Sequence, residues 1–155
     1  MTPRLNPMAT APEVMQSMIG LEKAVTNSGL ESSLIHLVKM RASQINGCSF
    51  CLKMHSKDAR AHGETEERLY LLDGWREAPI YSERERAALA WTEALTLVSQ
   101  TRAPDHDYEA IRAQFDDGEQ VKLTLLIGAI NAWNRLCVGF RIVPLVEGGP
   151  QVVRQ

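Results

Sequence analysis

The sequence lacks the features that mark membrane, secreted and repetitive proteins. It contains no apolar run long enough to span a bilayer, and its amino-terminal stretch Met1–Pro7 lacks the apolar core of a signal peptide. No strand-like alternation, internal repeat or low-complexity segment stands out. We therefore expect a cytoplasmic, all-α protein, and its 155 residues are expected to form a single domain over residues 1–155.

The sequence also lacks an excess of either charge. It has 17 Lys and Arg residues against 19 Asp and Glu residues, which gives a formal net charge of -2. Nucleic acids and anionic membrane surfaces are bound by strongly basic patches, so neither is expected as a partner.

Cysteine is scarce as well. The chain has three, an odd number, and two of them are clustered. This pattern suits a reducing compartment better than a framework of structural disulfides.

The chemistry that is present is concentrated between Asn46 and His55. Cys48 and Cys51 are three residues apart, and His55 follows Cys51 by four. Asn46-Gly47 is a helix-stop signal, so a new helix is expected to begin near Cys48 with all three side chains on one face. The free N–H groups and positive dipole end of that helix would favour a thiolate. The spacing predicts a redox site.

Helical rise separates the expected roles of the two cysteines. His55 lies one turn from Cys51 but about two turns from Cys48, so a histidine base would serve Cys51 better. Cys48, nearer the turn and expected to be more exposed, would then be the resolving thiol. In thioredoxin-type motifs the first cysteine is the acidic nucleophile, so the opposite order stays open.

His36 is the fourth candidate catalytic residue. If the helices on either side of Asn46-Gly47 are antiparallel, His36 and His55 should lie nearly level and could relay a proton through water. A histidine on an apolar face can equally be a packed, hydrogen-bonded core residue.

An extended stretch of the sequence, about residues 30 to 141, resembles a known family. The resemblance rests on these motifs: Arg41–Cys51 with His55, Ala59-Arg60, Gly63-Glu64, Arg68-Leu69, Trp75-Arg76, Pro79, Glu85–Leu89, Thr92-Glu93 and Ile130–Leu136. They resemble the AhpD-like alkylhydroperoxidases of the carboxymuconolactone decarboxylase superfamily. The true decarboxylases of that superfamily lack the cysteine pair, so their activity is not expected here.

The resemblance implies an all-helical bundle that assembles into trimers or hexamers and reduces hydroperoxides. The attacking cysteine would be Cys51, the resolving cysteine Cys48 and the proton relay His55. An external dithiol reductant is implied, and no cofactor or metal is expected. The family's relay usually includes a glutamate twelve residues before the first cysteine, and this chain has His36 there. That substitution removes a negative charge near the thiol.

Other segments read as supporting helices. We predict an extended arm over residues 1–9, a helix opened by a capping box at Thr10, and a short helix capped by Thr65. The other predicted helices cover about 31–45 and 48–62, one opened by Ser82, one capped by Asp105 or Asp107, and about 118–140. The longest one should be buried against the fold and a neighbouring subunit, and the tail from Arg141 has strand-like pieces.

Three further residues are assigned structural places. Cys137, alone among apolar residues, is expected to be a core thiol. His62 should cap the carboxyl end of its helix, and His106 should lie in a surface loop.

Two alternatives to a peroxidase remain. Cys48, Cys51, His55 and His36 could together hold a structural zinc ion in a binding protein. The same cysteines could instead serve a thiol–disulfide oxidoreductase or redox sensor without fast peroxidase activity. The presence of His36 makes the second alternative more credible.

Overall fold

The computed structural model describes residues 2–145, and in that range the chain is built from helices and contains no β-strand. The all-α prediction is therefore confirmed for this part of the chain. The helices are α1 (Pro7–Thr10), α2 (Pro12–Thr26), α3 (Ser32–Ile45), α4 (Ser49–Ala61), α5 (Glu66–Leu71), η1 (Leu72–Gly74), α6 (Glu83–Thr96), α7 (Val98–Thr101), α8 (Asp105–Gln114) and α9 (Asp117–Gly139).

Helix starts follow local capping chemistry where the sequence offers it. Ser82 and Asp116 each form a complete capping box with the glutamate three residues later. The Thr65 hydroxyl accepts a hydrogen bond from the N–H of Arg68. The caps predicted at Ser82 and Thr65 are confirmed.

Two predicted caps are wrong, and the predicted arm over residues 1–9 is too long, because its last three residues are helical. Residues Pro7–Thr10 form the short helix α1, and Asn6 caps it. The Thr10 hydroxyl donates to the Asn6 carbonyl, so α2 begins after Ala11 without a side-chain cap. Asp105 is the first residue of α8, behind Pro104, and His106 therefore lies in that helix, although its side chain is 80% exposed.

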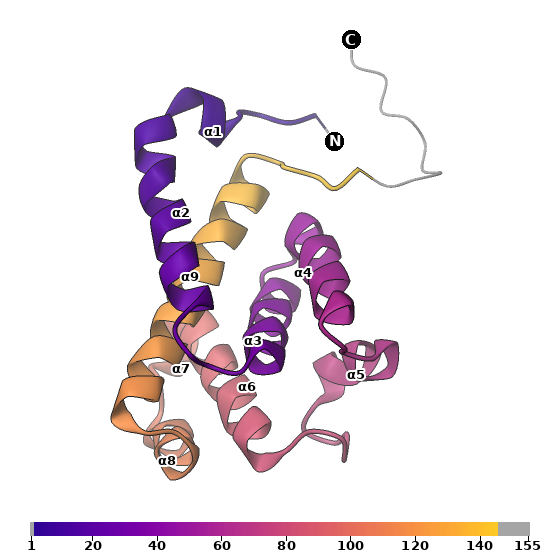
Figure 1. Ribbon diagram of the computed structural model, residues 1–155, viewed down its shortest axis with the longest axis vertical. Coiled ribbons are helices and arrows are strands. Elements are labelled where there is room, and N and C mark those ends of the chain that lie inside the picture. The colour runs from indigo at the N-terminus through magenta and orange to yellow at the C-terminus, as the bar shows by residue number, and fades with distance from the viewer. Residues whose placement is uncertain (1, 146–155) are drawn as a thin grey trace.

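Helix α3 is central, and its neighbours determine where the redox stretch lies. It packs against α4, α6 and α9, while α2 packs on α9 and α8 on α6 (Figure 1). One apolar cluster joins α2, α3, α6, α8 and α9, and a second joins α3 to the segment from α4 to α6. Because α3 contributes to both clusters, its carboxyl end is fixed from two sides.

The amino-terminal arm is bound to the end of α9. The backbone N–H of Arg4 donates to the carbonyl of Phe140 at 2.9 Å, and its guanidinium donates to the carbonyl of Gly139 at 3.0 Å. Both ends of the described chain therefore lie on the same side of the molecule (Figure 1).

Helix α9 is buried along one face and exposed along another. Leu123, Leu126 and Ile130 are fully buried. Three apolar residues of the same helix are about half exposed or more: Val121 at 60%, Leu125 at 51% and Val138 at 49%. Among residues 2–145, no helix combines the length and apolarity that crossing a bilayer needs.

The predicted strand-like tail is not found in the part that the structure describes. Residues 141–145 carry no strand, and residues 146–155 lie outside the described range.

Candidate redox site

The turn before the cysteine pair is closed by backbone hydrogen bonds. Gly47 adopts a φ of +63°, a left-handed conformation that glycine accepts without a Cβ penalty. The Cys48 N–H donates to the Ser43 carbonyl and the Gly47 N–H to the Gln44 carbonyl. This pair of bonds is a Schellman motif, which ends α3 and reverses the chain directly into α4.

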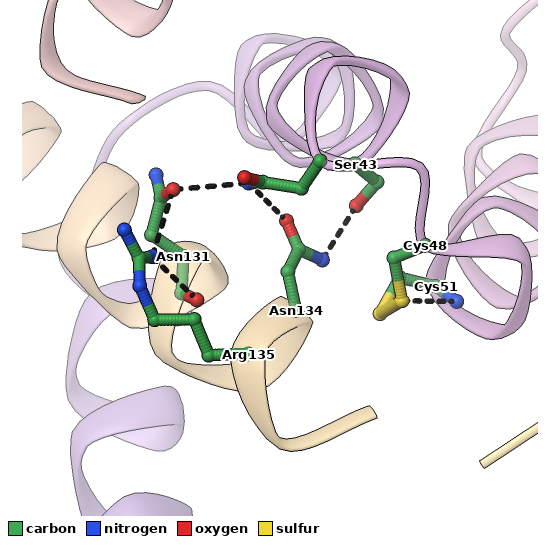
Figure 2. Close-up of a disulfide and its surroundings, with 7 residues drawn as sticks. Ser43, Cys48, Cys51, Asn131, Asn134 and Arg135 are labelled. Atoms are coloured by element: carbon green, nitrogen blue, oxygen red, sulfur yellow. Dashed lines mark hydrogen bonds between the residues drawn. A yellow bond between two sulfur atoms is a disulfide. The ribbon is translucent and has the colours of Figure 1, made fainter. Parts of the chain in front are cut away.

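Cys48 caps α4, and Cys51 lies in its first turn. The Cys48 sulfur accepts a hydrogen bond from the Cys51 N–H at 3.3 Å, and the two residues form a disulfide with their Cα atoms 5.4 Å apart (Figure 2). The helix therefore starts at Ser49, one residue later than predicted. Both cysteines are buried, at 2% exposure for Cys48 and 1% for Cys51, so the predicted difference in exposure is negligible.

His55 lies one turn after Cys51 on α4 and is only 5% exposed. Burial is the main cause that lowers the pKa of His55 to about 4, and the positive charge of Lys39 contributes to the same shift. The imidazole is therefore neutral at physiological pH, where one ring nitrogen can accept a proton.

A buried ion pair lies close to this histidine. The ammonium of Lys39, 5% exposed, bonds to the Glu22 carboxylate and to the Thr26 hydroxyl at 3.3 Å. Lys39 follows His36 by three residues on α3, and Glu22 comes from α2. The sequence analysis missed both residues, because their meeting depends on how α2 packs.

His36 lies against His62. Their ring centroids are 4.9 Å apart, and the His36 Nδ1 atom is buried without a hydrogen-bond partner. Burial and the charges of His62 and Lys39 lower the pKa of His36, and His36 in turn lowers the pKa of His55. His36 also lines a cavity of about 340 Å³ with His62 and Glu64. The predicted water relay to His55 stays a prediction.

His62 ends α4 as predicted. It is the C-cap residue, and its Nδ1–H donates to the Asp58 carbonyl oxygen at 2.7 Å. The same carbonyl also accepts the backbone N–H of His62 at 3.2 Å, so backbone and side chain of His62 close the last turn together.

Cys137 lies beside the cysteine pair. The sulfur atoms of Cys48, Cys51 and Cys137 all lie within 4.8 Å of one another, and Phe50 and Ile142 pack over them. Burial raises the pKa of the Cys137 thiol. Cys137 is thus a core thiol, as predicted, but its contact with the other two cysteines was not predicted.

The zinc alternative fails on this geometry. Among the described residues, the set of possible ligand atoms that comes together consists of the three cysteines, and neither His55 nor His36 belongs to it. The predicted ligand set of two cysteines and two histidines is therefore wrong.

A network of side-chain amides holds the turn against α9 (Figure 2). The Asn46 amide donates to the side-chain oxygens of Asn131 and Asn134, at 3.0 and 2.9 Å. Asn134 donates to the Ser43 hydroxyl at 3.1 Å, and Asn131 to that of Thr96 at 3.0 Å. The two asparagines, three residues apart, face the same way on α9, and this repeat is the signal from which the network could have been predicted.

Fold and site together define a class: an all-helical protein with a cysteine pair at a helix amino terminus and a buried histidine one turn on. The chain matches the carboxymuconolactone decarboxylase family over residues 12–94. It belongs to that family, and its structural relatives identify it as AhpD-like.

One curated relative and two solved structures are similar to this chain. The uncharacterised protein YdfG of Bacillus subtilis (strain 168) is 42% identical over 138 residues, which cover 89% of this chain and 94% of YdfG. The crystal structure of ATU0492 from Agrobacterium tumefaciens, a protein of unknown function assigned provisionally to AhpD-type antioxidant defence, is 49% identical, with a TM-score of 0.92 over 94% of this chain and all of that one. An uncharacterised peroxidase-related protein with an AhpD core from Ralstonia eutropha JMP134 shares the fold, with a TM-score of 0.78 at 19% identity over 90% of this chain and 75% of its own.

Proposed function

We propose that this protein is a thiol-dependent peroxidase that reduces hydroperoxides through Cys51 and Cys48, with His55 and His36 relaying protons. The observation that carries the proposal is the cysteine pair joined at the start of α4, one turn ahead of a buried histidine. Membership of an AhpD-like family supports the same chemistry.

The reaction would begin at Cys51. Its thiolate attacks the distal oxygen of the hydroperoxide, the O–O bond breaks, and Cys51 becomes a sulfenic acid. His55, neutral before the reaction, accepts the Cys51 thiol proton and returns it to the departing alkoxide, which leaves as an alcohol. A pKa of about 4 keeps His55 in the form that can accept that proton.

The second step would use Cys48. Its thiolate attacks the sulfenic sulfur, the S–O bond breaks, and the hydroxide leaves as water by taking up the proton that the Cys48 thiol has released. The Cys51 N–H bond to the Cys48 sulfur and the positive end of α4 both favour a Cys48 thiolate. The same stabilisation makes Cys48 a good leaving group when an external dithiol later reduces the disulfide.

Peroxide must reach sulfurs that are nearly covered. Phe50 and Ile142 pack on the cysteine cluster, and Ile142 belongs to the short segment that follows α9. We propose that a small hydroperoxide enters where this segment crosses the start of α4. A bulky hydroperoxide would then react more slowly than hydrogen peroxide.

The proposal includes a cellular setting. The enzyme would act in the cytoplasm as a homo-oligomer, a trimer or hexamer of single-domain subunits, and an external dithiol would supply the electrons. Residues Val121 and Leu125, apolar and exposed one turn apart, support a subunit interface along α9.

One observation favours a thiol–disulfide oxidoreductase or redox sensor instead. The position of the usual relay glutamate is occupied by His36, which contacts His62 and carries no negative charge. A peroxidase without that carboxylate would react slowly, whereas disulfide exchange would not need it.

Stopped-flow oxidation of the reduced protein by several hydroperoxides, followed by steady-state turnover with a dithiol, tests the proposal. Cys51→Ser should abolish peroxide consumption. Cys48→Ser should keep the first oxidation but slow repeated turnover roughly tenfold to a hundredfold, because the resolving thiol is no longer in place. Ser49→Ala, an exposed change in the same turn, is the matched control.

The reverse pattern, with Cys48→Ser inactive and Cys51→Ser oxidised once, would overturn the assigned order of the thiols. Wild-type protein that reacts with hydroperoxides no faster than free cysteine, but exchanges readily with disulfides, would favour the oxidoreductase.

A further inference from the structure

Cys137 is a buried thiol that has no role in the proposed mechanism. It lies close to Cys48 and Cys51, the two cysteines that the mechanism uses. The three sulfurs lie within 4.8 Å of one another, and Cys137 is 6% exposed. It comes from the last turns of α9, more than eighty residues along the chain from the pair. A thiol that only filled core space would be expected among aliphatic side chains, as most buried cysteines are.

The position of Cys137 is fixed by the amide network. Asn134, three residues before it, shares its face of α9 and bonds to Asn46 and Ser43 beside the cysteine turn. On its other side, the carbonyl of Cys137 accepts a hydrogen bond from the Ile142 N–H at 2.8 Å. The sulfur of Cys137 is therefore held next to the pair by contacts on both sides.

We propose that Cys137 is a second resolving cysteine, which forms a disulfide with Cys51 when Cys48 is not available. This inference rests on the proposed function. In the reaction, the Cys137 sulfur attacks the sulfenic sulfur of Cys51, an S–S bond forms and the S–O bond breaks. The hydroxide leaves with the Cys137 proton as water, and the two thiols together have lost the two electrons that the peroxide gained.

The required movement is small. A disulfide needs a sulfur–sulfur distance of about 2.05 Å, and a change of one χ1 rotamer swings a cysteine sulfur by roughly 3 Å. The sulfurs start from a separation of at most 4.8 Å, so the gap to be closed is comparable in length to one such change.

The protonation of Cys137 suits a reserve role. Burial raises the pKa of its thiol, so Cys137 stays protonated and does not compete with Cys51 for peroxide. Cys48, which caps α4 and receives an N–H bond, resolves first whenever it is free. When Cys48 is itself oxidised or blocked it cannot resolve the sulfenic acid, and Cys137 would then protect Cys51 from oxidation to the sulfinic acid.

The test compares reduced Cys48→Ser with Cys48→Ser/Cys137→Ser. Each protein is incubated with excess hydrogen peroxide and dimedone until Cys51 is consumed, however slowly, and is then analysed by intact mass and peptide mapping. Cys48→Ser should lose two hydrogens and yield a Cys51–Cys137 disulfide peptide. The double variant should carry at least tenfold more dimedone adduct on Cys51, because its sulfenic acid has no thiol partner.

Equal dimedone labelling of the two variants, with no Cys51–Cys137 peptide, would overturn the inference. Cys48→Ser/Cys137→Ala is run in parallel, and circular dichroism checks that each variant is folded. The rate of oxidation tests the proposed peroxidase function, whereas the product tests Cys137. A slow reaction that still ends in the Cys51–Cys137 disulfide would count against the peroxidase function and support the role of Cys137.

Discussion

His55 is buried as a neutral imidazole, and this makes the protein sensitive to acid. In the unfolded chain a histidine takes up a proton near pH 6.5, but in the folded protein the pKa of His55 is about 4. Between these values the unfolded state binds more protons, so the free energy of unfolding must fall as the pH falls.

We expect His55 to cost on the order of 3 kcal/mol of stability as the pH is lowered from about 6.5 to 4, with little effect above that window. His55→Gln should remove this pH dependence. Urea unfolding at a series of pH values would measure it, with the exposed His106→Gln as control. A wild-type stability as flat over this range as that of His55→Gln would contradict the assignment.

At the residue scale, the sequence predicted what local helical geometry controls. The spacing of Cys48, Cys51 and His55 is a property of one helix, so their common position at its start could be inferred from the sequence. Lys39 and Cys137 reach the site through the packing of α3 and α9. That packing depends on tertiary contacts that no local pattern specifies.

At the scale of elements, polar side chains connect α3, α4 and α9, and some of them are fully buried. Asn134 is 1% exposed, and its amide links the cysteine turn to α9 through Asn46 and Ser43. Inside a protein, a polar group that loses its partner keeps the cost of its lost hydration.

Asn134→Ala should therefore lower the free energy of unfolding by about 1–3 kcal/mol, since it leaves Asn46 and Ser43 without this partner. Denaturant titration of the reduced and oxidised protein measures the effect. Asn27→Ala, at the exposed end of α2, should change the free energy of unfolding by about 0.5 kcal/mol or less. Equal losses in the two variants would show that the amide network contributes nothing special.

Helix boundaries were predictable where side chains supply the cap. Ser82 and Asp116 begin helices because a glutamate three residues later completes the box, and Asn46-Gly47 ends α3 by the left-handed glycine. Thr10 misled the prediction because its hydroxyl bonds back to Asn6 within α1. A short helix one turn long has too little periodicity to be seen in the sequence.

At the scale of the whole molecule, an apolar surface on α9 continues into a groove. Val121 and Leu125 border a hollow of about 450 Å³ whose other walls include Trp91, Tyr108 and Ile111. Exposed apolar surface of this kind is typical of contacts between subunits.

Leu125→Glu should weaken the proposed trimer or hexamer, because it would bury a carboxylate without a partner at the interface. Size-exclusion chromatography with light scattering should show a shift toward smaller species, and Lys122→Gln, exposed on the same helix, should not shift. A wild-type protein that runs as a monomer at all concentrations would refute the interface.

The bonds from Arg4 to Gly139 and Phe140 join positions 135 and 136 residues apart. These hydrogen bonds bring the amino-terminal arm and the end of α9 together, although no covalent bond joins them. Because residues 4 and 140 already meet, a short peptide could join them while new ends are opened at Arg102, which is exposed in the connection between α7 and α8. The order in which the helices are synthesised would then change, and the sulfur atoms would lose the cover of Ile142, which lies beyond the new joint.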